Sequence, residues 1–163
     1  TGWANTAYSP NGGIRIKQGA LSMAGCLALA SQFIAAKTAN QATLLRRNGD
    51  GLADSVTREM RAASRAAKHA GSLPELFAIE GRAAALYFEN FPRMIRAGGA
   101  WALPAWSGRH GRHANDAMNA ALNYLYGLLT ADCIRSIVAC GLDPSGGFLH
   151  SSSRNKPATT DTA

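Results

Sequence analysis

Glu80 is the acidic residue whose surroundings in the sequence most favour chemistry. On a helix, the side chains three and four positions away share its face. A carboxylate removed from water without a partner is costly, so Glu80 is expected to take up a proton, form an ion pair or bind a metal ion. It is either a functional carboxylate, or a carboxylate at a face boundary that pairs with a distant Arg. Its four helical neighbours are all apolar: Leu76, Phe77, Ala83 and Ala84.

Two further residues of this segment bear on Glu80. Gly81 follows it directly, and a glycine inside a helix costs about 1 kcal/mol relative to alanine. This cost predicts that another backbone passes close to Gly81. Tyr87 lies seven positions after Glu80 on the same helical stripe. Tyr87 is therefore a candidate supporting residue for the carboxylate.

His150 is the second titratable residue of interest. It follows the Gly- and Pro-rich segment 141–149, and a turn of this kind is a good way to place an imidazole rigidly. A histidine in a loop is otherwise a surface residue. The meaning of His150 therefore depends on a partner carboxylate.

Polar side chains also form a stripe within the apolar segment that runs to Cys140, which Asn115 or Asp116 is expected to cap. Asn119, Asn123 and Tyr126 lie at helical spacing from Asp116, and asparagine inside a helix is unfavourable unless it bonds something. The alternatives are capping and inter-helix hydrogen bonds, or support of a site and contact with a phosphate.

A basic loop precedes this stripe. Its sequence is Arg109-His110-Gly111-Arg112-His113, so two arginines and two histidines surround one glycine. We predict that these two arginines, together with Arg82, contact DNA phosphates. A solvated loop is the alternative for residues 109–113.

The elements that must position these residues are predicted to be helices, which gives an all-α fold class. Residues 1–14 are expected to be a linker or the remnant of a preceding β domain, 15–150 a helical catalytic domain, and 151–163 an irregular tail. Basic residues of the second helix share related faces and are interpreted as a solvated face. The expected helices span about 17–47, 52–69, 72–91 with Ser72 and Glu75 as a capping box, and 116–140.

Charge and cysteine usage narrow the class of protein. The 163 residues carry 17 Lys and Arg against 10 Asp and Glu, a net charge of +7 that permits a polyanionic partner. Three cysteines in helix-like segments, without zinc spacing, predict a reduced chain in the cytoplasm. The uncharged stretch 18–36 is about long enough to cross a membrane, but its polar residues favour a helix in a soluble core.

Four segments resemble, in order, the motifs of the helical catalytic domain of the CRISPR-associated DNA integrase, Cas1. The resemblance covers roughly residues 15–157. The segments are Lys37-x-x-Asn40-Gln41-x-x-Leu44-Leu45-Arg46-Arg47, Glu80-Gly81-x-Ala83-Ala84-x-x-Tyr87-Phe88, Asp116-x-x-Asn119-x-x-Leu122-Asn123-Tyr124-x-Tyr126, and Gly141-Leu142-Asp143-Pro144-x-x-Gly147-Phe148-Leu149-His150.

The resemblance implies a metal-dependent DNA endonuclease and integrase of CRISPR spacer acquisition. Glu80 and His150 would be the catalytic residues and the ligands of Mg²⁺ or Mn²⁺, with Asn119, Asn123 and Tyr87 as supporting residues. The partners would be DNA (protospacer and CRISPR repeat), the Cas2 protein and, in the full-length protein, a second copy of the chain.

The sequence departs from the family pattern at both ends. Only a short remnant of the family's β domain precedes Lys17, and the family's third acidic ligand is missing, with Asp161 as a weak candidate. We therefore expect a truncated chain with weak metal binding and poor activity. The alternative is a non-catalytic DNA-binding or scaffold fragment of the same fold.

Overall fold

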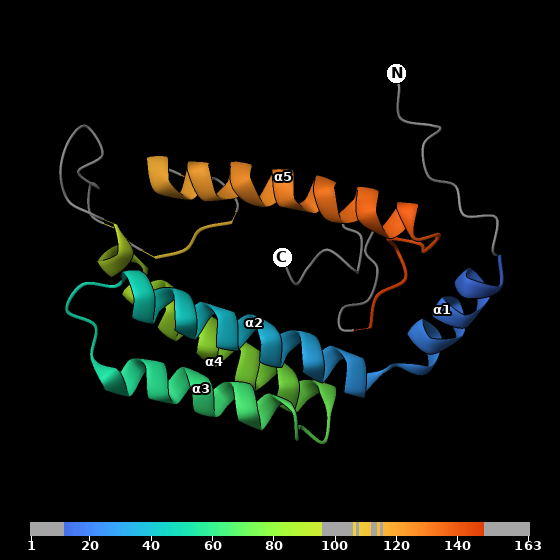
Figure 1. Ribbon diagram of the computed structural model, residues 1–163, viewed down its shortest axis with the longest axis horizontal. Helices are drawn as coiled ribbons and strands as arrows, with labels where there is room; N and C mark the ends of the chain where they lie inside the picture. Colours follow the sequence, from blue (N-terminus) through green and yellow to red (C-terminus); the bar gives the residue numbers. More distant parts are fainter. Residues whose placement is uncertain (1–11, 96–105, 107, 112–113, 115, 149–163) are drawn as a thin grey trace. The chain divides into compact units, whose positions relative to one another are not determined.

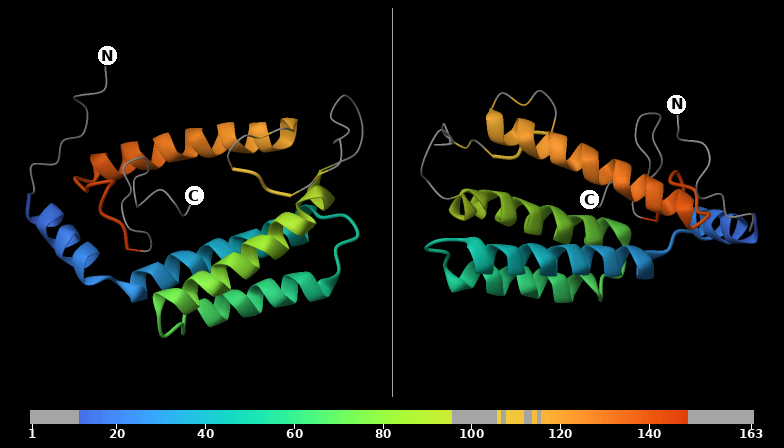
Figure 2. Two further views of the ribbon diagram at one scale, coloured as in Figure 1. Left: turned by 180° about the vertical axis from the view of Figure 1, so that it is seen from behind. Right: turned by 45° about the horizontal axis from the view of Figure 1, so that its top comes forward.

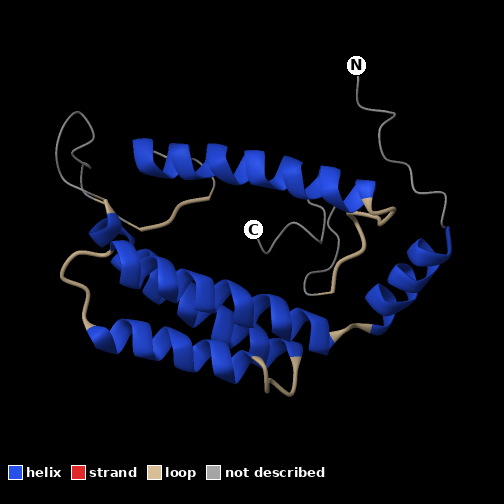
Figure 3. Ribbon diagram, viewed as in Figure 1, coloured by secondary structure: helices blue, strands red, loops and turns tan. Residues whose placement is uncertain are grey.

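The computed structural model describes residues 12–95, 106, 108–111, 114 and 116–148. Within this part of the chain every regular element is a helix and none is a strand, which confirms the all-α fold class (Figures 1 and 3). The helices are α1 (Gly12–Ala24), α2 (Leu27–Asn48), α3 (Asp54–Ala67), α4 (Leu73–Asn90), the short 3₁₀ helix η1 (Phe91–Met94) and α5 (Ala117–Ala139).

The chain divides into two compact units. One comprises Ser31–Asn123, and the other comprises Thr1–Ala30 together with Tyr124–Ala163. In the first unit, α2, α3 and α4 lie side by side as an antiparallel three-helix bundle (Figure 2). In the second unit, α1 contacts the turn that follows α5.

The bundle has a small, tightly closed core. Ala42 and Leu45 of α2 meet Met60 of α3 and Tyr87 of α4, and partly buried side chains of the neighbouring turns pack around them. Small residues on α2 let the helices approach, so a hydroxyl can bond a neighbouring backbone: Ser64 Oγ donates to Ala35 O at 2.7 Å. The partly buried side chains around the core are Leu52, Val56, Leu86, Phe88, Phe91 and Met94.

The start of α4 follows the predicted capping pattern. Ser72 is the N-cap, and its hydroxyl oxygen accepts a hydrogen bond from Glu75 N at 3.3 Å. The Glu75 carboxylate accepts from Gly71 N at 2.8 Å, one residue earlier than in the standard capping box. The cap fixes where α4 begins and therefore where Glu80 falls along it.

The predicted continuous helix over residues 17–47 is wrong. Gly25, with φ of 73°, ends α1, and α2 begins at Leu27. Glycine adopts this left-handed conformation without the strain that other residues incur, so it breaks a run that is otherwise well suited to a helix. No described helix is by itself long and apolar enough to cross a membrane. The bent pair α1 and α2 meets that criterion only when its two parts are counted together.

The basic stripe on α3 lies in solvent, as predicted. All four cations are exposed, and among the described residues none of them forms an ion pair. Their long side chains therefore serve as a solvated face opposite the buried one. The four residues are Arg58, Arg61, Arg65 and Lys68.

Candidate functional site

Glu80 lies in the middle of α4 and forms an ion pair with a lysine of α2. Lys37 Nζ is 3.1 Å from Glu80 Oε1, and the two side chains are 24% and 25% exposed. Of the three predicted outcomes for this carboxylate, the structure shows the ion pair. Its partner is a lysine instead of the distant arginine considered above. Among the described residues, no hydrogen bond reaches Glu80 Oε2, so this oxygen is available to a ligand.

The prediction that a backbone passes close to Gly81 is wrong. Gly81 is exposed, and a Cβ added there would meet no atom within 4 Å. Because α4 presents Gly81 to solvent, its lack of a side chain serves no packing purpose among the described residues.

Asn119 connects the start of α5 to the basic loop. It is fully buried, and its side-chain Nδ2 donates to Gly108 O at 2.9 Å while its Oδ1 accepts from His110 N at 2.9 Å. Arg109 also donates to Asn119 Oδ1, at 3.2 Å. One amide thus holds three consecutive loop residues, which is the capping and bridging role weighed for the polar stripe.

Asp116 caps α5, as its position in the sequence predicts. Its carboxylate accepts from Asn119 N and from Asn119 Nδ2, both at 2.7 Å. The hydrogen bond from the Asn119 side chain is the largest cause that lowers the pKa of Asp116 from its ordinary value of 3.8. The Asn119 backbone N–H adds to the effect, and partial burial opposes it. The carboxylate therefore stays ionised at the positive end of the helix dipole.

Trp106 fixes the other end of this loop. Its indole Nε1 donates to Phe88 O at 3.1 Å, and its ring stacks on Phe91 with centroids 5.4 Å apart. Phe88 O would normally accept from the residue four positions on, but that residue is Pro92, which has no N–H. Phe91 N donates to Phe88 O in place of the residue four positions on, and the indole is a second donor to the same carbonyl.

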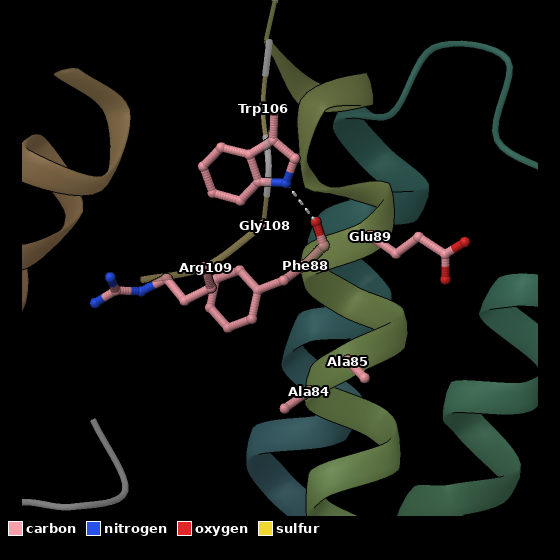
Figure 4. A pocket seen from close by; sticks show the side chains of 7 residues that line it. All are labelled: Ala84, Ala85, Phe88, Glu89, Trp106, Gly108 and Arg109. Carbon is pink, nitrogen blue, oxygen red and sulfur yellow. Dashed lines mark hydrogen bonds between the residues drawn. The ribbon is translucent and has the colours of Figure 1, made fainter. Parts of the chain in front are cut away.

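A cavity of about 540 Å³ lies between this loop and α4. Trp106, the Phe88 ring and Arg109 border it on one side of the helix, while the Glu89 side chain extends away from them (Figure 4). Its floor is formed by Ala84 and Ala85, the first of which lies one turn after Glu80 on α4. An aromatic wall, a small-residue floor and a guanidinium suit a planar or phosphorylated group.

The remaining predicted residues of this unit lie apart from Glu80. Tyr87 is 6% exposed in the bundle core, edge-to-face with Phe88 at 5.1 Å. Asn123 is half-buried, and Arg82 is exposed on α4 and does not line the cavity. The structure therefore brings together Arg109 and Asn119, whereas Tyr87 contributes to packing.

The turn that precedes His150 is described up to Phe148. Helix α5 ends where Gly141, with φ of 78°, lets Leu142 N bond Ile137 O at 3.0 Å, which confirms the predicted stop. Asp143 then opens a tight turn, in which Ser145 N and Oγ donate to Asp143 Oδ1 at 2.8 and 2.6 Å. These bonds, that of the hydroxyl first, lower the pKa of Asp143.

Three of the predicted site residues lie outside the described residues: His150, Arg112 and Asp161. Within the described ranges, no three His, Cys, Asp or Glu side chains gather into a group that would hold a metal ion. Glu80, with one oxygen on Lys37 and the other unbonded, is a suitable donor for a hard divalent cation, and a histidine is a suitable companion.

Sequence reasoning missed three contributors: Lys37, Trp106 and Gln18. Lys37 lies in a quoted motif, but its partner is 43 positions away. The signal for Trp106 was Pro92, which has no N–H to donate to Phe88 O four positions earlier. Gln18 bonds residues 125 and 128 positions later, and no local pattern indicates such a pair.

Comparison with protein families decides the classification. The family model "CRISPR associated protein Cas1" matches residues 1–160 of the 163. The chain belongs to the Cas1 family. Its curated relatives include a Cas4 exonuclease/Cas1 endonuclease fusion of Geobacter sulfurreducens, which is 40% identical over 144 residues covering 82% of this chain. A Cas1 endonuclease of Thermus thermophilus is 35% identical over 135 residues covering 81% of the chain.

Solved structures show the same Cas1 fold. A Cas6-RT-Cas1–Cas2 complex matches 98% of this chain and 18% of its own with a TM-score of 0.75 at 19% identity. A casposase bound to its integration product matches 98% of this chain and 45% of its own, with a TM-score of 0.69 at 23% identity. The chain spans 25% of the Geobacter protein and 37% of the Thermus protein.

Proposed function

We propose that this chain is a helical catalytic domain of a Cas1-type DNA endonuclease and integrase that acts in CRISPR spacer acquisition. The observation that carries the proposal is Glu80. It is a half-buried carboxylate in the middle of α4, with one unbonded oxygen, in a chain whose family membership is established. The names of the relatives as endonucleases, and of one structural neighbour as bound to an integration product, support the reaction class.

Glu80 and His150 are proposed to hold Mg²⁺ or Mn²⁺. When bound, such an ion orients the reacting groups and neutralises charge that develops on a phosphodiester. Lys37 Nζ donates to Glu80 Oε1 and so helps to fix the position of the carboxylate. A partly exposed ion pair of this kind contributes about 1 kcal/mol or less. We therefore propose that a divalent cation can take the place of the Lys37 ammonium group beside Glu80.

Arg109 is proposed to contact a DNA phosphate beside the cavity on α4. Asn119 and Trp106 fix the loop on both sides of Arg109 and so limit where its guanidinium can reach. Arg82 and Arg112 are proposed to add further phosphate contacts, and Asn123 and Tyr87 to support the site from α5 and the bundle core.

The proposed partners follow from the family. Structural neighbours are complexes that contain Cas1 together with Cas2, which supports Cas2 as a partner. We further propose protospacer and repeat DNA as substrates, a second copy of the chain in the assembled protein, and a cytoplasmic location. Free thiols at all three cysteines agree with that location.

The test is strand joining and cleavage on DNA that contains a CRISPR repeat. We expect Glu80→Ala and His150→Ala each to abolish the metal-dependent reaction, because each removes a proposed ligand. Glu59→Ala, which removes an exposed carboxylate of α3, is the matched control and should leave the rate unchanged. Unchanged joining in either ligand variant would overturn the site assignment.

A second candidate is a DNA-binding or scaffold role without catalysis on the same fold. It is favoured by the net charge of +7, which suits a polyanionic partner whether or not a metal ion is bound. DNA binding that persists with no metal-dependent cleavage under any divalent cation would support this second candidate.

A further inference from the structure

The ion pair between Lys37 and Glu80 lies at an edge of the bundle, where α2 and α4 run side by side (Figure 2). On α2, Lys37 lies between the buried Ile34 and the exposed Asn40, each three positions away. On α4, Glu80 has the buried Ala83 three positions on. The two side chains are 24% and 25% exposed, so their stems pack against the bundle while their charged ends remain accessible to a ligand in solution.

Lys37 has hydrogen-bond donors to spare, but its charge is cancelled. An ammonium group has three N–H donors, and among the described residues the one acceptor of Lys37 Nζ is Glu80 Oε1, at 3.1 Å. Other donors of Lys37 are therefore open to a further oxygen atom. A phosphodiester gains little from them, because the carboxylate beside them cancels the positive charge and repels a second anion.

A carboxylate oxygen and a phosphate oxygen are interchangeable partners for an ammonium group. Both are negatively charged acceptors of short, charge-assisted hydrogen bonds. Glu80 Oε1 therefore occupies a position beside Lys37 Nζ that a phosphate oxygen could take. Because the pair is partly exposed, it is weak enough for such an exchange.

The cavity that Arg109 borders lies close to this pair. Ala84 forms part of its floor and follows Glu80 by one turn of α4, a rise of about 6 Å. The ion pair and the cavity are therefore neighbours along α4, and one DNA strand can contact both.

We propose that Lys37 is a DNA-phosphate contact, and that Glu80 masks it by cancelling its charge until the carboxylate binds a cation. This inference rests on the proposed function, in which Glu80 is a metal ligand and DNA is the substrate. It makes one phosphate contact conditional on the state of Glu80. Cation binding at Glu80 and phosphate binding at Lys37 then strengthen each other, because such coupling is reciprocal.

The first test is the salt dependence of DNA binding in EDTA, so that no metal ion takes part, measured by fluorescence anisotropy of a labelled duplex. Glu80→Gln removes the masking charge. We expect the slope of log K against log salt to become steeper by about 0.9, the value of one added phosphate contact. Glu59→Gln removes an exposed carboxylate of α3 and changes the net charge equally, so this control should keep the slope of the parent chain.

The second test asks whether Lys37 is the cation that Glu80→Gln unmasks. Lys37→Met in the Glu80→Gln background should return the slope to the parent value, because methionine replaces most of the stem but carries no charge. Lys68→Met, at an exposed lysine that follows α3, should leave the steeper slope unchanged in the same background. Lys37→Arg should also keep it, because the cation is retained, so the test does not depend on one variant folding.

A lysine that served only as the partner of Glu80 would behave differently. Once the carboxylate is gone, Lys37→Met would then have no effect on DNA binding. A steeper slope that persists in the Lys37→Met variant, or a Glu80→Gln slope equal to that of Glu59→Gln, would therefore rule out the proposed contact.

Metal-dependent joining in Glu80→Ala separates this inference from the proposed function. If joining is abolished while Glu80→Gln leaves the slope unchanged, the Lys37 contact fails and the proposed function stands. If joining is unchanged in Glu80→Ala, the metal assignment fails and the conditional role of Lys37 fails with it.

Discussion

The ion pair between Lys37 and Glu80 joins side chains of two helices that are 43 positions apart in the chain. The sequence predicted that Glu80 needs a partner, because its helical neighbours are apolar. It could not predict which partner, because the choice depends on how α2 and α4 pack. The same holds for Gln18, whose partners are set by the contact between α1 and the turn at Asp143.

Asn119 offers a test of the loop at the level of one residue. Asn119→Leu would remove the hydrogen bonds to Gly108 O and from His110 N at a side chain that is itself fully buried. We expect the free energy of unfolding to fall by about 1–3 kcal/mol, measured by urea denaturation. Asn123→Leu, at a half-buried position of the same helix, is the control and should cost clearly less. Equal losses in the two variants would contradict the assigned role of Asn119.

The positions of the helices were the part of the structure that the sequence predicted best, because the residues that cap or end a helix act on their immediate neighbours. Ser72, Asp116 and Gly141 mark the ends of their helices as the sequence indicated. The break at Gly25 was missed because the residues around it continue an apolar, uncharged run. The close backbone approach expected at Gly81 was wrong because α4 turns that glycine toward solvent.

The cap of α5 predicts a pH dependence of stability. The pKa of Asp116 is lower in the folded chain than its ordinary value of 3.8, chiefly because Asn119 donates to the ionised form. Its contribution is therefore fully present above about pH 3.8 and is lost as the pH falls through the lower, folded-state pKa.

Asp116→Asn is the variant that reports this effect. An asparagine still caps the helix, but its NH₂ group cannot accept from Asn119 Nδ2. We expect the variant to melt below the parent at pH 7 and the gap in Tm to narrow below pH 4. A gap that stays constant between pH 7 and pH 2.5 would mean that the Asp116 charge contributes nothing.

At the scale of the whole molecule, the net charge of +7 permits a polyanionic partner. We expect binding to DNA without sequence preference and a steep loss of affinity with salt, because phosphate contacts release counterions. Arg82→Gln and Arg109→Gln should each reduce the slope of log K against log salt by about 0.9. Fluorescence anisotropy between 50 and 200 mM salt (roughly the range in which such contacts are lost) measures this slope.

Arg61→Gln on α3 is the matched control for charge. Its stripe lies in solvent and is assigned no DNA contact, so the slope should equal that of the parent chain. If Arg61→Gln reduced the slope and Arg109→Gln did not, the DNA contact would be assigned to α3 and not to the loop before α5.

The bonds between Gln18 and Asp143 also constrain the order of folding. The bundle of α2, α3 and α4 is built from contiguous residues, whereas the other unit joins two segments 125 positions apart. Closing so long a loop is slow, and during synthesis the second segment emerges roughly 6–25 s after the first, at about 5–20 residues per second. The bundle therefore has time to form first. Until the turn at Asp143 has been synthesised, Gln18 and Ser22 lack the backbone groups to which they donate. Among the described residues, the segment 141–147 is therefore the last to be fixed in place.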